Sequence, residues 1–221
     1  MPKTEARLTF DAGRGVVSAA FDRPARSVAT LAIAHGAGAG LDHPFLLGFA
    51  EAMKDEGVAT LRFNFPYMEA GRRSPDPAPA AVAAWRAAFD VAAERSGKTP
   101  VFAGGKSYGG RIASMAVAEG MPATGLVFLG YPLHPPGRPE KIRDEHLYGI
   151  SVPMLFVQGT GDAFADPVLL AKVLKKIGSR AELHAIEGGD HSFNVRGARR
   201  DGRSVGASLA PTVAVFIRKH V

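Results

Sequence analysis

The chain has 221 residues, of which 46% are hydrophobic and 22% charged, a balance typical of a globular domain with a substantial core. It contains no cysteine, which excludes disulfide scaffolds, zinc sites with cysteine ligands and thiol nucleophiles. No apolar run is long enough for a signal peptide or a membrane span, so we expect one soluble, cytoplasmic domain over residues 1–221 that binds no membrane.

The net charge is +6, and arginines are densest between residues 196 and 204. An excess of positive charge attracts phosphate-rich partners, but no aromatic residues are interleaved there to stack on bases. We therefore expect a solvated basic face and no nucleic-acid binding, with a preference for anionic substrates as a milder alternative.

In chain order, the first feature is a pair of short β-rich runs around Gly13-Arg14-Gly15, which predicts an antiparallel hairpin at one edge of a sheet. Short apolar runs then alternate with longer segments that have the pattern of helices. This alternation predicts a mainly parallel sheet covered by helices on both faces. The predicted strands are Leu8–Phe10, Val16–Phe21, Thr30–Ala34, Ala59–Phe63, Val101–Gly104, Gly125–Leu129, Val152–Gln158 and Arg180–Ile186. The predicted helices are Pro44–Glu56, Ala78–Glu94, Gly109–Glu119, Pro167–Ile177 and Ser204–Lys219.

Capping residues support several of these helices. Asp166 followed by Pro167 is typical of an N-cap with proline at the first helical position. Glycines stand where the predicted helices should end, at positions 57, 97, 120 and 178.

Ligands bind at the carboxyl ends of the strands in such a sheet, so the residues after each strand carry the functional information. After the strand Val101–Gly104 comes Gly105-Lys106-Ser107-Tyr108-Gly109, followed at once by a helix. A strand, a sharp turn and a helix form the setting in which a hydrolytic serine is exposed, and the flanking glycines allow helix and strand to approach closely. The sequence thus predicts Ser107 as a nucleophile.

Other interpretations of the glycine-rich stretches fail on spacing. A phosphate-binding P-loop would need a glycine at Pro100, so Lys106 is interpreted as the variable residue of the turn, with no phosphate to bind. A dinucleotide-binding motif would need a glycine at Leu41. A second serine between glycines, Ser204, has no strand before it and no carboxylate after it, and we interpret it as the N-cap of the last helix.

A serine nucleophile needs a base, and the base needs an acid to orient it. His191 follows the last predicted strand in a short glycine-containing loop and is the candidate base. Asp162 follows an apolar strand through a tight turn and is the candidate acid. Asp166 is explained as a helix cap, and Asp190 adjoins His191 and is badly placed to reach the outer nitrogen of its ring.

An oxyanion needs two N–H donors. One candidate is the backbone amide of Tyr108, the residue after the nucleophile. The other comes from the small-residue loop that follows an earlier strand, where we favour Ala37 and keep Gly38 as the near alternative.

With these residues in place, the chain resembles an α/β-hydrolase, and is similar to the small, lidless, dienelactone-hydrolase-like branch. The resemblance covers nearly the whole chain and is carried by LAIAHGAGAGLDHPF, LRFNFPYMEAGRR, FAGGKSYGGRIAS, LFVQGTGDAF and GGDHSF. It implies a three-layer α/β/α sandwich with a mostly parallel eight-stranded sheet, and a triad of Ser107, Asp162 and His191. Dienelactone hydrolases proper use a cysteine nucleophile, which this chain lacks.

Only 22 residues separate Leu129 from Val152, too few for a substantial helical cap, so we expect an open, shallow site. Phe65, Tyr67, Tyr131 and His134 are the candidate residues for contact with substrate, together with Leu133.

These features predict a serine esterase that cleaves a small soluble ester, thioester or lactone, with no metal or organic cofactor. A catalytically silent binding or scaffold module of the same fold is the alternative, because related domains serve as scaffolds in larger assemblies. The sequence leaves the oligomeric state open between monomer and homodimer.

Overall fold

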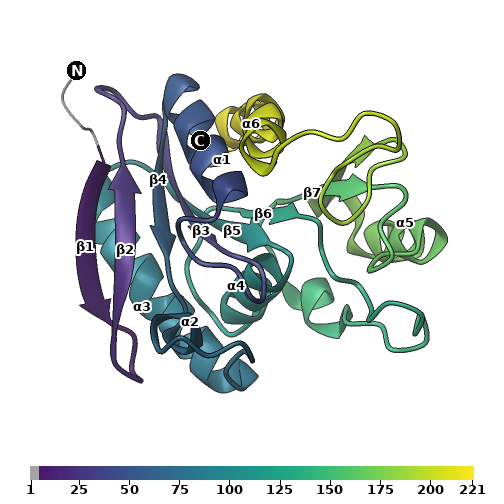
Figure 1. Ribbon diagram of the computed structural model, residues 1–221, viewed down its shortest axis with the longest axis horizontal. Coiled ribbons are helices and arrows are strands. Elements are labelled where there is room, and N and C mark those ends of the chain that lie inside the picture. The colour runs from purple at the N-terminus through teal and green to yellow at the C-terminus, as the bar shows by residue number, and fades with distance from the viewer. Residues whose placement is uncertain (1–4) are drawn as a thin grey trace.

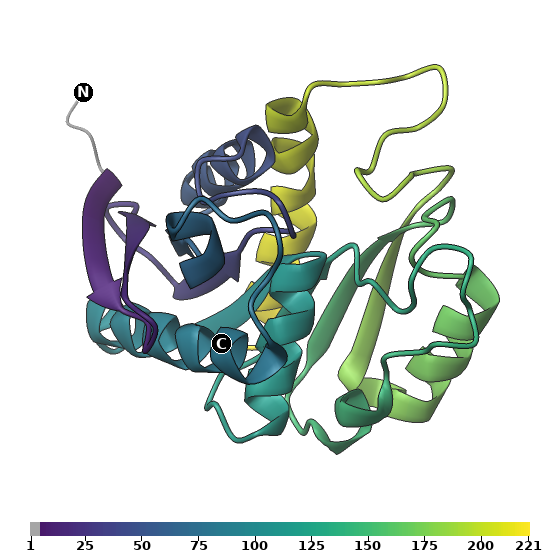
Figure 2. The same cartoon turned by 60° about the horizontal axis from the view of Figure 1, so that its bottom comes forward.

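The computed structural model describes residues 5–221, which form a twisted eight-stranded sheet between two layers of helices (Figures 1 and 2). The order of strands across the sheet is β1-β2-β4-β3-β5-β6-β7-β8. Strand β2 pairs antiparallel with both β1 and β4, and the remaining neighbours are parallel. The strands are β1 (Glu5–Asp11), β2 (Val16–Asp22), β3 (Ala29–Ala34), β4 (Val58–Phe63), β5 (Val101–Lys106), β6 (Leu126–Leu129), β7 (Met154–Gly159) and β8 (Ala181–Ile186).

Helices cover both faces of this sheet (Figure 2). Helices α1 (Pro44–Asp55) and α6 (Gly202–Lys219) pack on one face. Helices α3 (Ala78–Ser96), α4 (Tyr108–Ala118) and α5 (Pro167–Ile177) pack on the other. The remaining elements are the four-residue helix α2 (Pro66–Glu69) and the short 3-10 helices Glu145–Gly149 and Gly178–Arg180.

The central strands are apolar throughout because successive side chains enter different cores. In β6, Leu126 and Phe128 pack with α3 and α4, whereas Val127 and Leu129 pack with α1 and α6. The predicted fold class, a three-layer sandwich around a mostly parallel eight-stranded sheet, is confirmed. Between β6 and β7 the only regular element is the 3-10 helix Glu145–Gly149, so no helical cap is inserted there.

Most elements begin or end one to three residues from the predicted position, and two further details differ from the sequence prediction. The last helix begins at Gly202, and the carboxylate of Asp201 accepts the Ser204 amide at 3.0 Å, so the prediction that Ser204 is the N-cap was wrong. Both residue types cap helices, and the start of the helix lies two residues earlier than predicted. Helix α2 was not predicted, because four residues are too few to show a helical period.

Helices α1 and α6 are in close contact through glycines. A Cβ atom at Gly206 would lie 2.0 Å from the carbonyl oxygen of Phe45, and one at Gly48 would lie 2.0 Å from that of Arg203. This contact holds the first turns of the two helices side by side, and both helix starts border the site described below. Among residues 5–221, every helix is too short or too polar to span a lipid bilayer.

We expect Gly206→Ala to destabilise the protein by about 2 kcal/mol, because the new methyl group overlaps the backbone of α1 and forces the helices apart. Urea unfolding monitored by circular dichroism measures the change. Gly202→Ala is the matched control in the same helix, because the nearest atom to its Cβ would be 3.5 Å away. Equal unfolding midpoints for Gly206→Ala and wild type would contradict the packing argument.

Candidate active site

Ser107 lies on the turn that connects β5 to α4, at the carboxyl edge of the sheet. Its φ of 50° is in the left-handed region, which a non-glycine residue rarely adopts. The turn requires a close approach of backbones: a Cβ atom at Gly105 or Gly109 would lie 2.6 or 2.5 Å from the carbonyl oxygen of Ala34. The strained turn directs the Ser107 side chain away from the core and toward the loop after β8.

The structure brings Ser107, His191 and Asp162 together as a hydrogen-bonded chain. His191 Nε2 lies 2.9 Å from Ser107 Oγ, and His191 Nδ1 lies 2.7 Å from Asp162 Oδ2. When Nδ1 carries its hydrogen and donates it to Asp162, Nε2 is left as the acceptor for the serine proton. The predicted residues therefore have the geometry of nucleophile, base and orienting acid.

Asp162 is held in place by two further donors. The Gln158 side-chain amide donates to Oδ2 at 2.6 Å, and the Phe164 backbone amide donates to Oδ1 at 2.8 Å. The side chain is only 1% exposed, and the Phe164 ring lies over the His191 imidazole with ring centroids 4.2 Å apart. Gln158 was not identified from the sequence, because the prediction places it at the end of the strand Val152–Gln158 and gives it no separate role.

The alternative acid, Asp190, is engaged within its own loop. Its Oδ1 atom accepts the backbone amides of Ser192 and Asn194 at 2.8 and 2.9 Å. The carboxylate shapes the turn that carries His191, whereas Asp162 bonds the imidazole.

The loop after β3 offers one of the two predicted oxyanion donors. The Gly38 amide donates to the Tyr67 hydroxyl at 3.3 Å. Within residues 5–221, the amides of Ala37 and Tyr108 donate to no group. Ala37 lines the same cavity as Ser107, and Tyr108 directly follows the serine. These two amides are available to a ligand, and the Gly38 amide is occupied.

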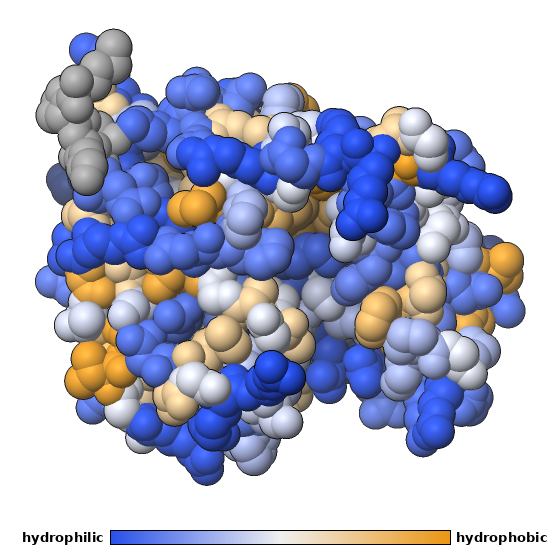
Figure 3. All heavy atoms as spheres, in the orientation of Figure 1, coloured by the Kyte–Doolittle hydropathy of each residue, from blue (hydrophilic) through white to orange (hydrophobic). Residues whose placement is uncertain are grey.

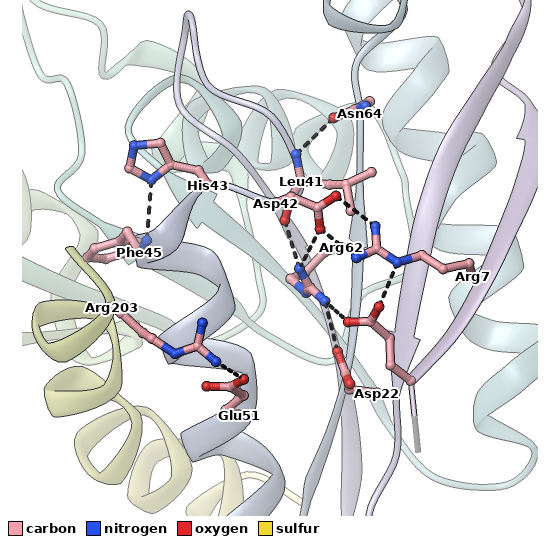
Figure 4. A network of polar contacts seen from close by, with 11 residues as sticks. Arg7, Asp22, Leu41, Asp42, His43, Phe45, Glu51, Arg62, Asn64 and Arg203 are labelled. Carbon is pink, nitrogen blue, oxygen red and sulfur yellow. Dashed lines mark hydrogen bonds and ion pairs between the residues drawn. The ribbon is translucent and has the colours of Figure 1, made fainter. Parts of the chain in front are cut away.

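An ionic network centred on the buried Arg62 holds the far end of this loop (Figure 4). Arg62 on β4 is 1% exposed and donates to the Leu41 carbonyl at 2.8 Å. The same guanidinium pairs with Asp22 at 3.1 Å and Glu5 at 2.5 Å, so its charge is compensated inside the protein. The Leu41 amide donates to Asn64 Oδ1 at 2.8 Å, and both bonds fix the loop to the sheet.

A cavity of about 600 Å³ opens beside Ser107 and His191. This volume suits a small organic ligand. Apolar side chains form part of its wall, and basic side chains lie at the end formed by the loop between β8 and α6. The lining residues are His35, Gly36, Ala37, Ala39, His43, Phe45, Leu46, Lys106, Ser107, Phe164, His191, Ser192, Asn194, Arg199, Arg200, Asp201 and Gly202.

The residues predicted to line the site are not in this wall. Phe65, Tyr67, Tyr131 and Leu133 are fully buried, and His134 is 4% exposed. Each follows a strand as predicted, but its side chain turns under the site into the core. The prediction of their position at the strand ends is confirmed, and the prediction that they line the cavity is wrong.

These buried residues support the site from below. The Tyr131 amide donates to Gln158 Oε1, and Gln158 in turn donates to Asp162. The His134 amide donates to the Phe164 carbonyl, and His134 Nε2 accepts the Asp166 amide at 2.9 Å. The Tyr67 hydroxyl likewise accepts the Gly38 amide. Their hydrogen bonds therefore position the loops that carry Asp162 and Ala37.

Lys106, next to the nucleophile, lines the cavity as well. Its ammonium lies 5.4 Å from the centroid of the Phe193 ring. Burial lowers the pKa of Lys106 to about 8, and the nearby charges of Asp162 and Asp190 oppose that shift. That Lys106 binds no phosphate stays a prediction.

His35 is a buried residue of the site that sequence reasoning passed over. Its Nε2 accepts the Phe65 amide at 3.2 Å, so Nδ1 carries the hydrogen and donates it to the Gly36 carbonyl at 2.8 Å. Burial lowers the pKa of His35 to about 4, so the imidazole is neutral at physiological pH. Its place at the end of β3, directly before the glycine-rich loop, was the available signal.

Comparison with known proteins agrees with the fold described above. A family model described as an alpha/beta hydrolase domain matches residues 27–219. A serine hydrolase without a lid from Xanthomonas campestris is 20% identical, with a TM-score of 0.75, over 99% of this chain and 96% of that one.

Two further solved structures have the same fold. A dienelactone hydrolase from Anabaena variabilis is 19% identical, with a TM-score of 0.77, over 98% of both chains. A cold-adapted esterase from an Arctic intertidal metagenomic library is 15% identical, with a TM-score of 0.74, over 100% of this chain and 96% of that one. At these identities the structural likeness establishes the fold.

We expect acidification to destabilise the protein through His35. Its pKa is lower in the folded state than the value of about 6.5 in an unfolded chain, so between those values the unfolded state binds more protons and stability falls as the pH falls. The contribution lost between pH 7 and pH 5 is about 2 kcal/mol. Urea unfolding at both pH values measures how much stability is lost on acidification. That loss should be about 2 kcal/mol smaller for His35→Gln than for wild type.

His184 on β8 is exposed and serves as the control. The variant His184→Gln should keep the wild-type dependence of stability on pH. If stability depends on pH in His35→Gln as it does in wild type, burial does not lower the pKa of His35 and the prediction is contradicted.

Proposed function

Because the chain belongs to the α/β-hydrolase domain family, we propose that it is a serine hydrolase that cleaves a small ester, thioester or lactone. The observation that carries this proposal is the hydrogen-bonded chain from Ser107 through His191 to Asp162, at the wall of a cavity. Similarity to proteins described as esterases and a dienelactone hydrolase supports the class of bond.

In the proposed reaction, His191 Nε2 takes the proton from Ser107 Oγ as the oxygen attacks the substrate carbonyl. The developing imidazolium is stabilised by Asp162, which is buried and already bonded to Nδ1. His191 then gives the proton to the leaving group, and an acyl group remains on Ser107. Water, deprotonated by the same imidazole, releases the acid and restores the serine.

The negative charge that develops on the carbonyl oxygen needs donors that are not already used. The amides of Ala37 and Tyr108 meet that condition in residues 5–221. The Gly38 amide, bonded to Tyr67, does not. We therefore assign the oxyanion hole to Ala37 and Tyr108.

The first test is covalent labelling. A fluorophosphonate probe should label the wild type on Ser107, and Ser107→Ala should lose both the label and at least about a thousandfold of the rate on p-nitrophenyl acetate. Mass spectrometry of the labelled peptide identifies the modified residue. No adduct on the wild type, or an adduct that survives in Ser107→Ala, would favour the catalytically silent alternative.

The second test separates the two candidate acids. Asp162→Asn should lower kcat by about a thousandfold, because the amide no longer stabilises the imidazolium or fixes its tautomer. Asp190→Asn is the matched control: its side-chain oxygen can still accept the Ser192 and Asn194 amides, so kcat should stay within about tenfold of wild type. If steady-state assays show a larger loss of kcat for Asp190→Asn than for Asp162→Asn, the acid is Asp190.

A further inference from the structure

Three arginines lie beside the cavity in the loop between β8 and α6. Arg199 and Arg200 line the cavity that contains Ser107. Arg196 and Arg199 line a second cavity, of about 510 Å³. Ser192, Asn194 and Arg199 belong to both walls, so the two cavities adjoin along this loop. We call residues 192–201 the arginine loop.

The three guanidinium groups have no partner in the described part of the chain, residues 5–221. Asp190 and Asp201 line the same cavities as these arginines, but their carboxylates accept backbone amides and pair with no guanidinium group of the three. Asp190 accepts two amides of its own turn, and Asp201 accepts the Ser204 amide and hydroxyl. The charges of the three arginines are therefore not used to hold the fold together.

Arg203 provides a contrast a few residues further along the chain. Its guanidinium is paired with Glu51 on α1, across the contact of α1 and α6 (Figure 4). In the orientation of Figure 1, the region where the arginine loop runs is covered mainly by strongly hydrophilic side chains (Figure 3). An arginine with a structural role in this region thus has a carboxylate partner, and the three beside the cavities do not.

The backbone of the arginine loop is fixed at several points. Phe193 is 1% exposed, and its ring stacks on Phe45 with centroids 6.0 Å apart. Asn194 Oδ1 accepts the Arg200 amide at 3.0 Å, and Val195 forms β-bridges with Gly189 and Ala198. The arginines therefore project from an ordered backbone, which lowers the entropy lost when they bind a ligand.

We propose that the arginine loop binds phosphate groups carried by the leaving group of the substrate, an inference that rests on the proposed serine hydrolase function. The leaving group takes its proton from His191, so it lies beside that residue, and the arginine loop begins at the next residue. Guanidinium groups bind phosphate oxygens in a bidentate manner. Three unpaired guanidinium groups match several phosphate charges better than the single charge of a carboxylate.

The test compares two thioesters with the same reacting bond. Acetyl-coenzyme A carries phosphates on its leaving group, and acetyl-pantetheine has the same thiol arm without them. We expect kcat/KM to be at least about tenfold higher for acetyl-coenzyme A at low salt, and the ratio to approach one in about 0.5 M salt. The double variant Arg199→Gln/Arg200→Gln should lose this preference, and the single variant Arg199→Gln should lose part of it.

Binding without turnover is measured separately. Calorimetry with Ser107→Ala should show that free coenzyme A binds more tightly than pantetheine. Adding Arg199→Gln and Arg200→Gln should weaken coenzyme A binding by at least about tenfold. Arg14→Gln removes the same charge from the β1–β2 hairpin, away from the loop in Figure 1, and should change neither measurement. Unfolding midpoints establish that the variants are folded.

The two proposals fail in different ways. If coenzyme A binding depends on Arg199 and Arg200 but no thioester or ester is cleaved and Ser107 is not labelled, the phosphate site stands and the serine hydrolase function is rejected. If hydrolysis occurs but both thioesters react equally, or the double variant retains the wild-type preference, the phosphate site is overturned. Equal affinity of Ser107→Ala for coenzyme A and pantetheine overturns it as well.

Discussion

The close approach of α4 to the ends of β3 and β5 is the constraint on which the site depends. Ser107 has a backbone conformation that costs about 1–3 kcal/mol, and it persists only where the surroundings allow no other path for the chain. Gly105 and Gly109 permit the approach, and the apolar face of α4 packed on the sheet holds it. Without that turn the serine hydroxyl would not reach His191, and the cavity would lack the proposed nucleophile.

The other parts of the site come from loops, and each loop is tied to the sheet by a polar residue beneath it. Gln158, inside β7, joins the Tyr131 amide to the Asp162 carboxylate. Arg62, inside β4, bonds the carbonyl of Leu41 in the loop that carries Ala37. A site held in this way has its donors and acceptors in position before a ligand arrives, and for the proposed hydrolase such preorganisation is the main source of electrostatic stabilisation. The same hydrogen bonds satisfy polar groups that would otherwise be costly to bury.

The sequence predicted features that depend on position along a strand and missed those that depend on the direction of a side chain. Ser107, Asp162 and His191 follow strands whose carboxyl ends share one edge. Their proximity could therefore be predicted from these positions together with the order serine, acid, histidine expected for the fold. Whether Tyr131 turns toward the cavity or under it depends on which loop covers it, and that information is tertiary. The arginine loop illustrates the same limit: Phe193 anchors it through a buried stack on Phe45, and nothing in the local pattern indicates that contact.

The roles of the charged residues likewise depend on tertiary contacts that the sequence does not show. The net charge of +6 is a sum over residues that the sequence cannot separate by role. In the fold, Arg62 is matched inside the protein by carboxylates from two other strands, and Arg203 is matched by Glu51 at the surface. A matched charge adds little to the field outside the molecule, whereas unmatched charges beside a partly apolar cavity concentrate the field there. If the arginine loop binds phosphate as proposed, the basic character of this chain acts on ligands where arginines remain unmatched beside a cavity. At the Ser107 cavity those arginines lie between β8 and α6, in the same connection as the proposed base.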